Sequence, residues 1–205
     1  MGTVSVDLSM SLDGFVAGPD DGPEAPLGRG GERLHEWVYG LASWRARHGH
    51  EGGQVNRDAE ILEEAFATTG AIVMGRRMFD LAEVPWGDNP PFHVPVFVVT
   101  HRGRAPIVKQ GGTTFTFVTD GVEGALDRAR AAAGDADISI AGGASIAQQA
   151  LRAGLLDQIQ VHVVPILLGG GRRLFDDLGT ARVNLETDRV VPSPAVTHMR
   201  FRVMK

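Results

Sequence analysis

The chain of 205 residues holds 25 acidic and 20 basic side chains, a formal net charge of −5, and its 43% hydrophobic content is ordinary for one globular domain. The acidic balance disfavours a nucleic-acid-binding protein, and the absence of cysteine excludes disulfides and thiolate chemistry. Because no apolar run approaches the roughly 20 residues of a membrane span and the N-terminus lacks the pattern of a secretory signal, we expect a cytoplasmic protein that does not bind membranes.

The N-terminal part of the chain predicts a strand, two loops and two helices. Apolar and polar residues alternate over residues 4–10, as in a half-buried strand, and "LDGFVAG" interrupts and then resumes this strand. Glycine, proline and aspartate dominate residues 18–31, which is typical of a loop that covers a site or is mobile. The next predicted elements are a helix over 32–44, a loop over 45–55, and a helix that begins at Asn56 or Asp58 and ends at Gly70.

The middle of the chain alternates strands with helices. "AIVMG" (71–75) and "VPVFVVT" (94–100) are continuous apolar runs, typical of strands covered on both faces. "TTFTFVT" (113–119) and "DISIA" (137–141) are further strands, and a helix follows each of them. Asp120 and Glu123 have the spacing of a capping box for the first of these helices.

The C-terminal part of the chain predicts only strands. "IQVHVVPILL" (159–168) is a long strand in which Pro165 indicates a bulge or a sheet edge, and two alternating strands follow. Strands that alternate with helices imply a largely parallel sheet, which the terminal antiparallel pair makes mixed. We therefore expect a single α/β domain over residues 1–205, with a mostly parallel central sheet of about eight strands and helices on both faces.

Basic residues follow two of the buried strands. Arg76 and Arg77 come directly after the strand that ends at Gly75, and "THR" (100–102) closes the next strand along the chain. Ligands of open α/β sheets bind at the carboxyl ends of strands, where guanidinium groups suit phosphate oxygens. Such a rim favours NADPH, with its extra phosphate, over NADH. The alternatives are a solvated arginine pair and an ordinary polar loop.

Two glycine-rich turns follow later strands. Gly142 and Gly143 precede a helix, so they are either a tight turn or a place where a pyrophosphate approaches the backbone. The turn "GGGRR" (169–173) is either flexible or a second backbone surface at a ligand. His48 and His50 have a metal-ligand spacing without an evident third ligand, so we predict no metal site. His162, within an apolar strand, is more typical of a buried structural residue than of a catalyst.

Five segments carry a family resemblance. They are "SLDGFVAG" (11–18), "VMGRRMFD" (73–80), "VFVVTHR" (96–102), "IAGGASIAQQAL" (140–151) and "LLDQIQVHVVPILLGGGRRLF" (155–175), and together they span nearly the whole chain. In this order they resemble the dihydrofolate reductase-like superfamily. Within it, the chain is most similar to the reductase domain of the bifunctional riboflavin-biosynthesis deaminase–reductase and its stand-alone relatives.

The resemblance implies an NADPH-dependent reductase of a small polar heterocyclic or sugar-derived C=N or C=O group, and a homodimer. In such a protein the pyrophosphate lies against Gly142 and Gly143, and the adenosine side lies at the Gly-Arg-Arg turn. The implied cofactor-binding residues are Val16 and Ala17 at the nicotinamide, Gly75, Arg76 and Arg77, then Thr100, His101 and Arg102 at the 2′-phosphate, and Ala141, Gly142, Gly143, Ala144, Ser145 and Ile146. The candidate substrate-binding residues are Gly170, Gly171 and Arg172, with Arg173 beside them.

The catalytic acid is the least determined part of the prediction. Folate-reducing members of the superfamily carry an acidic residue on the first helix. Here that helix is "GERLHEWVYGL", in which Glu32 and Glu36 are the candidates and Leu34 could equally occupy the position. The alternatives that stay open are a pterin or folate reductase, a non-catalytic NADP-binding sensor, and a structural dimer without cofactor.

Overall fold

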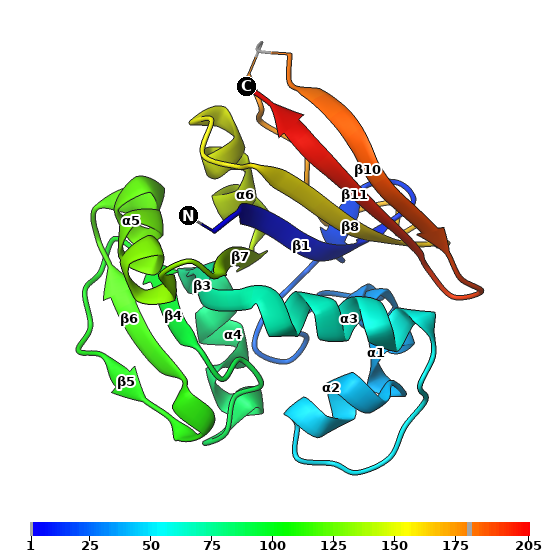
Figure 1. Ribbon diagram of the computed structural model, residues 1–205, viewed down its shortest axis with the longest axis horizontal. Helices are drawn as coiled ribbons and strands as arrows, with labels where there is room; N and C mark the ends of the chain where they lie inside the picture. Colours follow the sequence, from blue (N-terminus) through cyan, green and yellow to red (C-terminus); the bar gives the residue numbers. More distant parts are fainter. Residues whose placement is uncertain (1, 180–181) are drawn as a thin grey trace.

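The computed structural model describes residues 2–179 and 182–205, which form a mixed α/β structure around one large sheet (Figure 1). The strand order is β10-β11-β8-β1-β7-β3-β4-β6-β5. The six strands from β8 to β6 run parallel, and β10, β11 and β5 are antiparallel to their neighbours. The strands are β1 (Val4–Ser11), β3 (Thr69–Gly75), β4 (Pro95–Val99), β5 (Ile107–Val108), β6 (Thr114–Val118), β7 (Asp137–Gly142), β8 (Gln158–Val164), β10 (Asn184–Pro192) and β11 (Thr197–Met204).

A small second sheet joins two segments far apart in the sequence. β2 (Phe15–Ala17) pairs with β9 (Arg172–Arg173), so the segment after the first strand leaves the main sheet instead of continuing it. Asp13 fixes this arrangement, because its carboxylate accepts hydrogen bonds from the backbone N–H groups of Leu168 and Gly169, at 3.1 and 2.8 Å. The glycine-rich turn is thereby held beside the N-terminal strands.

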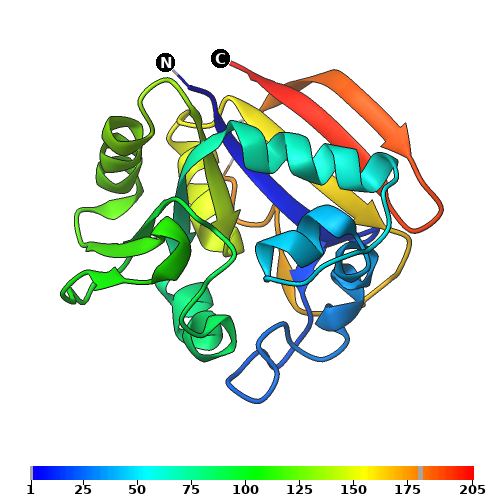
Figure 2. The same ribbon diagram turned by 60° about the horizontal axis from the view of Figure 1, so that its bottom comes forward.

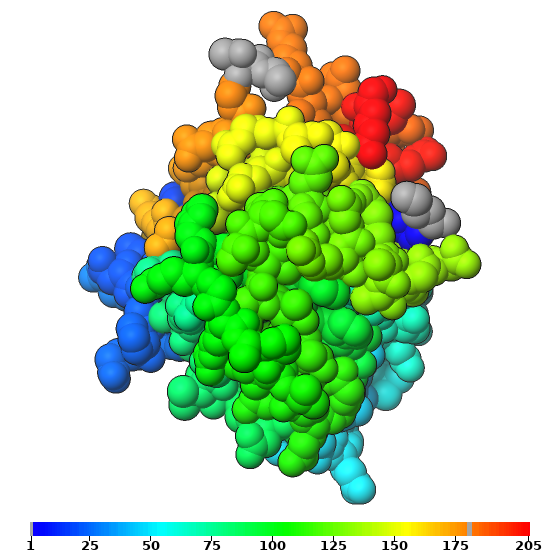
Figure 3. Space-filling model, turned by 90° about the vertical axis from the view of Figure 1, so that its left-hand side faces the viewer, coloured from blue at the N-terminus to red at the C-terminus, as the bar shows by residue number. Residues whose placement is uncertain are grey.

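Helices cover both faces of the main sheet, as predicted (Figures 1 and 2). α5 and α6 pack on one face, and α3 and α4 lie on the other. Figure 3 views the end of the sheet where β5, β6 and α5 (green) form the surface. The helices are α1 (Glu36–Tyr39), α2 (Ala42–Arg47), α3 (Arg57–Thr68), α4 (Arg76–Trp86), α5 (Gly121–Ala133) and α6 (Ala144–Arg152), with short 3-10 turns η1 (Gly31–Leu34) and η2 (Gln110–Gly112).

β3 shows why its sequence is continuously apolar. Ala71 and Val73 belong to the core beneath α5 and α6, whereas Ile72 and Met74 pack on the opposite face with Phe79 of α4. Since successive side chains of a strand point to opposite faces, a strand covered on both sides has no polar position. This confirms the prediction for the two apolar runs at residues 71–75 and 94–100.

Several local predictions are wrong, each for an identifiable reason. The helix expected over 32–44 is three short pieces, because the chain turns at His35 and again at Gly40 and Leu41. Asp120 does not cap α5, since its carboxylate binds the guanidinium of Arg128 at 2.8 Å instead. β8 is an interior strand that ends at Val164, so Pro165 follows the strand and marks neither a bulge nor a sheet edge. α3 ends at Thr68, so Gly70 lies in β3 and does not end the helix. Asn56 does cap α3, by accepting a hydrogen bond from the backbone N–H of Ala59 at 3.0 Å.

Across residues 2–179 and 182–205, no helix has the length and apolar character needed to cross a membrane. In the same part of the chain, no three His, Cys, Asp or Glu side chains are grouped so that they could hold a metal ion.

Candidate active site

A groove of about 510 Å³ opens at the carboxyl ends of β3, β4 and β7, which are neighbours in the sheet. β3 ends at Gly75, which is also the N-cap of α4, and β7 is followed by Gly143, the N-cap of α6. A side chain at Gly75 would place its Cβ 3.2 Å from Cγ1 of Ile146, so glycine allows the two helix starts to approach each other. The groove is thus built from the strand ends that the sequence singled out.

Both helices begin in the groove without a side-chain cap. Neither Gly75 nor Gly143 has a side chain that could accept from the first N–H groups of its helix. In α6 the N–H of Ile146 donates to the backbone carbonyl of Gly143 at 3.0 Å, whereas the N–H groups before it lack an acceptor within the helix. Two such helix N-termini favour an anion through their free N–H groups and their dipoles. The groove therefore suits an anionic group.

Four arginines, Arg76, Arg77, Arg172 and Arg173, add positive charge to the groove. Arg76 pairs with Asp80 at 2.6 Å and lies over the ring of Phe117, with 5.5 Å between its guanidinium carbon and the ring centroid. Arg77 and Arg172, from α4 and β9, both bind the carboxylate of Asp21, at 2.5 and 2.9 Å. Asp21 therefore holds the 18–31 loop against the groove.

The electrostatics of Asp21 follow from these contacts. Partial burial on its own would raise the pKa of the Asp21 carboxyl, but the hydrogen bonds from Arg77 and Arg172 outweigh it and hold that pKa below its ordinary value. Asp21 is consequently charged at neutral pH. It engages two of the four arginines that line the groove.

The structure brings most of the predicted binding residues to the groove. Those that line it are Gly75, Arg76, Arg77, Thr100, His101, Gly143, Ala144, Ser145, Ile146, Gly171 and Arg172, together with Arg173. Those that do not line it are Val16, Ala17, Arg102, Ala141, Gly142 and Gly170. Val16 packs against the main core, Ala17 pairs with Arg172 in the small sheet, and Ala141 lines the cavity described next. The binding roles of all these residues, whether or not they line the groove, stay predictions.

A second cavity, of about 250 Å³, lies next to the groove. The two share Met78, whose side chain forms part of both walls. Aromatic rings dominate this cavity: Trp37, Trp44, Phe66, Trp86 and Phe92. A cavity of this size with aromatic walls suits a small planar molecule.

A few polar groups interrupt the aromatic walls. Asp7 of β1, His35 and His162 of β8 all line the cavity. Nδ1 of His35 is buried and has no hydrogen-bond partner in the part of the chain that the structure describes. Burial lowers the pKa of His35, so its imidazole is neutral at pH 7. A polar group of a ligand would satisfy this nitrogen, because buried polar atoms rarely stay unpaired.

The predicted catalytic acids lie elsewhere. Glu32 and Glu36 are exposed and line neither the cavity nor the groove. Their catalytic role stays a prediction that these positions do not support. The acidic residue at the cavity is Asp7, which sequence reasoning took for a solvent-facing position of the first strand. Its signal was weak, since an aspartate in an alternating strand is ordinary.

Comparison with solved structures defines the class of the fold. The chain aligns over its full length with a candidate riboflavin biosynthesis protein from Shewanella sp. PV-4 (TM-score 0.69, 19% identity, 100% of that chain covered). It aligns likewise with RibD of Acinetobacter baumannii (0.62, 16%, 59% of that chain) and with dihydrofolate reductase of Enterococcus faecalis complexed with NADP(H) (0.55, 13%, 98% of that chain). At these identities the likeness shows the fold, which is that of the dihydrofolate reductase-like proteins.

The sequence places the chain within that class. A family model, the RibD C-terminal domain, matches residues 2–198, and the chain belongs to this family. A curated relative, the uncharacterized protein YyaP of Bacillus subtilis (strain 168), is 26% identical over 121 residues. The matched region is 56% of this chain and 63% of that relative.

Proposed function

We propose that this protein is a reductase of the riboflavin-biosynthesis type, which uses NADPH to reduce a C=N or C=O bond of a small polar heterocyclic or sugar-derived substrate. The observation that carries the proposal is the juxtaposition of the two hollows. A phosphate-binding groove with uncapped helix N-termini meets an aromatic cavity at Met78. One structural neighbour, 12% identical to this chain, is a Thermotoga maritima diaminohydroxyphosphoribosylaminopyrimidine deaminase and 5-amino-6-(5-phosphoribosylamino)uracil reductase.

The residues of the groove fit the cofactor. The N–H groups at the start of α6, after Gly143, would hold the pyrophosphate of NADPH. Those at the start of α4, together with Arg76, would hold its 2′-phosphate. When bound, NADPH supplies the hydride. The chain's own part is to orient the substrate between aromatic walls, to exclude water and to place a proton.

Nucleotide binding tests the groove. Arg76→Ala removes one charge-assisted contact, which is worth about 1.5–3 kcal/mol, so NADPH should bind roughly 10–100-fold more weakly while NADH affinity changes little. Arg57→Ala is the matched control, because Arg57 also opens a helix and pairs with an acid one turn on, Glu60, away from the groove. Calorimetry with both nucleotides measures this. Equal affinity of the wild-type protein for NADPH and NADH would overturn the 2′-phosphate assignment.

A substrate panel separates the remaining functions. A pterin or folate reductase would oxidise NADPH with dihydrofolate, and a sensor would bind NADPH without oxidising it with any substrate. No specific observation on the molecule favours either over the proposed reductase. Homodimerisation and a cytoplasmic location belong to the same proposal, and light scattering on the purified chain tests the first of them.

A further inference from the structure

Four ionisable side chains form one hydrogen-bonded chain between the sheet and α3. Nε2 of His162 lies 2.7 Å from Oδ1 of Asp7, the Nδ1 atoms of His162 and His198 lie 2.7 Å apart, and Nε2 of His198 lies 3.0 Å from Oδ1 of Asp58. Strand register explains the alignment, because His162 of β8 is directly opposite His198 of β11. Both histidines and Asp58 are less than 9% exposed.

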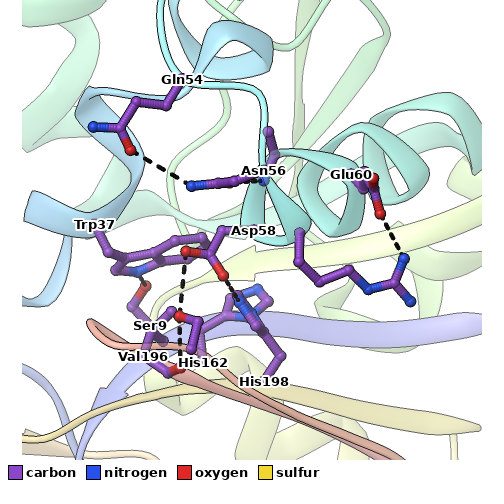
Figure 4. Close-up of polar contacts among 12 residues, drawn as sticks. Ser9, Trp37, Gln54, Asn56, Asp58, Glu60, His162, Val196 and His198 are labelled. Atoms are coloured by element: carbon purple, nitrogen blue, oxygen red, sulfur yellow. Dashed lines mark hydrogen bonds and ion pairs between the residues drawn. The ribbon is translucent and has the colours of Figure 1, made fainter.

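The tryptophan at the cavity fixes the two imidazoles in place. The ring of Trp37 lies 4.9 Å from that of His162 and 5.1 Å from that of His198, measured between centroids. Its indole N–H donates to Oγ of Ser9 at 3.0 Å, which orients the ring (Figure 4). Figure 4 also shows Asp58 reaching down from α3 to His198. The rings of His162 and His198 are therefore tightly packed and have little freedom to rotate out of their hydrogen bonds.

The contact between the two Nδ1 atoms determines how many protons the chain holds. A hydrogen bond needs one proton, so the three contacts need three. Two neutral imidazoles supply only two. The third makes one histidine an imidazolium or one carboxylate a carboxylic acid, and in either case the four residues carry a net charge of −1. Moving this proton along the chain leaves that charge unchanged.

The surroundings disfavour His198 as the site of the third proton. Burial lowers the pKa of His198, even though the hydrogen bond to Asp58 opposes this effect. The half of the hydrogen-bonded chain that lines the cavity consists of Asp7 and His162. The other charged or titratable groups that face this half are His35, Arg47 of α2, Glu64 of α3, Asp137 of β7, and Arg189 and Arg200 of β10 and β11. Glu64 is paired with both Arg189 and Arg200.

Of the four hydrogen-bonded side chains, those at one end line the aromatic cavity. Asp7 and His162 line the aromatic cavity, whereas Asp58 and His198 do not. Each ring nitrogen of His162 has a single hydrogen-bonding site, and both sites are used within the chain, whereas each carboxyl oxygen of Asp7 has a second one, so the group able to release a proton into the cavity is the carboxyl of Asp7. The second oxygen of Asp7 accepts from the amide of Gln160 at 3.0 Å, which holds the carboxyl in place.

We propose that Asp7 donates the proton that completes reduction in the cavity, and that His162, His198 and Asp58 position it and hold its proton. The inference rests on the proposed function, which supplies the hydride. The O–H bond of Asp7 breaks as an N–H or O–H bond forms on the substrate. Asp7 had gained that proton from Nε2 of the His162 imidazolium, which kept its Nδ1 proton, shared with Nδ1 of His198, and became neutral. After the transfer the chain holds two protons, and water restores the third.

The first test needs no turnover. In protein labelled with ¹⁵N-histidine, a proton bound to Nδ1 of His162 or His198 should be observed at pH 7 and should vanish in His198→Phe. Its absence from the wild-type protein would overturn the proposal, because every arrangement of three protons places one between these nitrogens. A thermal melt of His198→Phe establishes that the variant is folded.

The second test is kinetic. Asp7→Asn keeps the shape but cannot donate an acidic proton, so kcat should fall about 10²–10⁴-fold with an unchanged Kd for NADPH. In His198→Phe the alkaline limb of the pH profile should move, which a merely structural role would not produce. Asp127→Asn is the control: it makes the same chemical change at an exposed position of α5 that lines neither the cavity nor the groove, and it should keep the wild-type rate.

The outcomes separate the two proposals. An Asp7→Asn variant within threefold of the wild-type rate would refute the donor role alone. Wild-type protein that neither binds nor oxidises NADPH would refute the proposed function, and the donor role with it, whereas the Nδ1 proton would still be seen.

Discussion

The glycine pair at the groove allows two identical substitutions, one residue apart, with opposite expected effects. Gly142 has a φ of +150°, and a Cβ there would lie 2.5 Å from Sδ of Met78. Gly143 has a φ of −73°, and a Cβ there would have no atom within 4 Å. Gly142 therefore faces the wall between groove and cavity, whereas Gly143 faces the open groove.

Gly142→Ala should damage the fold. A side chain at this φ costs about 1–2 kcal/mol, and displacing Met78 costs about 1–3 kcal/mol more. The free energy of unfolding should fall by about 2–5 kcal/mol, which corresponds to a drop in Tm of roughly 5–15 °C for a domain of this size. Differential scanning calorimetry measures it.

Gly143→Ala should damage binding instead. The φ and ψ values suit alanine, whose smaller unfolded-state entropy stabilises by about 0.4–1 kcal/mol, and the poorer N-cap costs a similar amount. The stability should therefore stay within about 1 kcal/mol of the wild type. The methyl group would occupy the place where a phosphate oxygen meets the backbone, and losing one such bond weakens NADPH binding about 10–100-fold.

Gly40→Ala provides the control for the pair, since Gly40 has a φ of −86° and lies outside the groove. It should change neither Tm nor NADPH affinity appreciably. Wild-type NADPH affinity in Gly143→Ala would refute the pyrophosphate assignment. Wild-type stability in Gly142→Ala would refute the steric argument from Met78.

Three further outcomes follow from single contacts. Asp21→Asn frees the guanidinium groups of Arg77 and Arg172, so NADPH should bind several-fold more tightly at low salt, and amide exchange over residues 18–31 should accelerate. The hydrogen bonds from Ser11 and from the backbone of residues 168–169 lower the pKa of Asp13 to about 2. The ionised Asp13 carboxylate therefore stabilises the fold above about pH 4, and this stabilisation is lost as the pH falls toward 2. In acid titrations Asp13→Ala should not show this loss. Burial lowers the pKa of His35 below 6.5, so its imidazole binds more protons in the unfolded protein than in the folded one. Stability should therefore fall as the pH drops below about 6.5, and it should fall less steeply in His35→Phe.

The cofactor groove could be predicted from the sequence because its parts are local. Gly75 with Arg76 and Arg77, and Gly143 with the residues after it, each join a strand end to the next helix start within a few positions. Parallel topology then brings such ends together at one edge of the sheet. Asp21 was out of reach, because nothing in a glycine-rich loop indicates which of its acids meets an arginine 56 or 151 positions away.

The proton chain could not be predicted, since its three contacts join residues 155, 36 and 140 positions apart. The two histidines meet only through the register of β8 with β11, and register depends on the packed sheet. The expectation that His162 is a buried, satisfied residue is correct as far as its burial and hydrogen bonds go. The expectation did not include that Asp7, a hydrogen-bond partner of His162, lines the aromatic cavity.

Stability alone gives no reason for this chain of ionisable groups. Burying charged and polar groups costs several kcal/mol before their mutual contacts offset it, and apolar side chains of similar volume are often as stable or more so. Such side chains are already nearby, since Leu34, Val38 and Val196 form an apolar cluster with Trp37, whose ring contacts both histidines. A larger apolar cluster would therefore have closed the space between α3 and the sheet. The arrangement is better explained by its cavity end, where Asp7 places an exchangeable proton next to the aromatic walls that the proposed substrate would occupy.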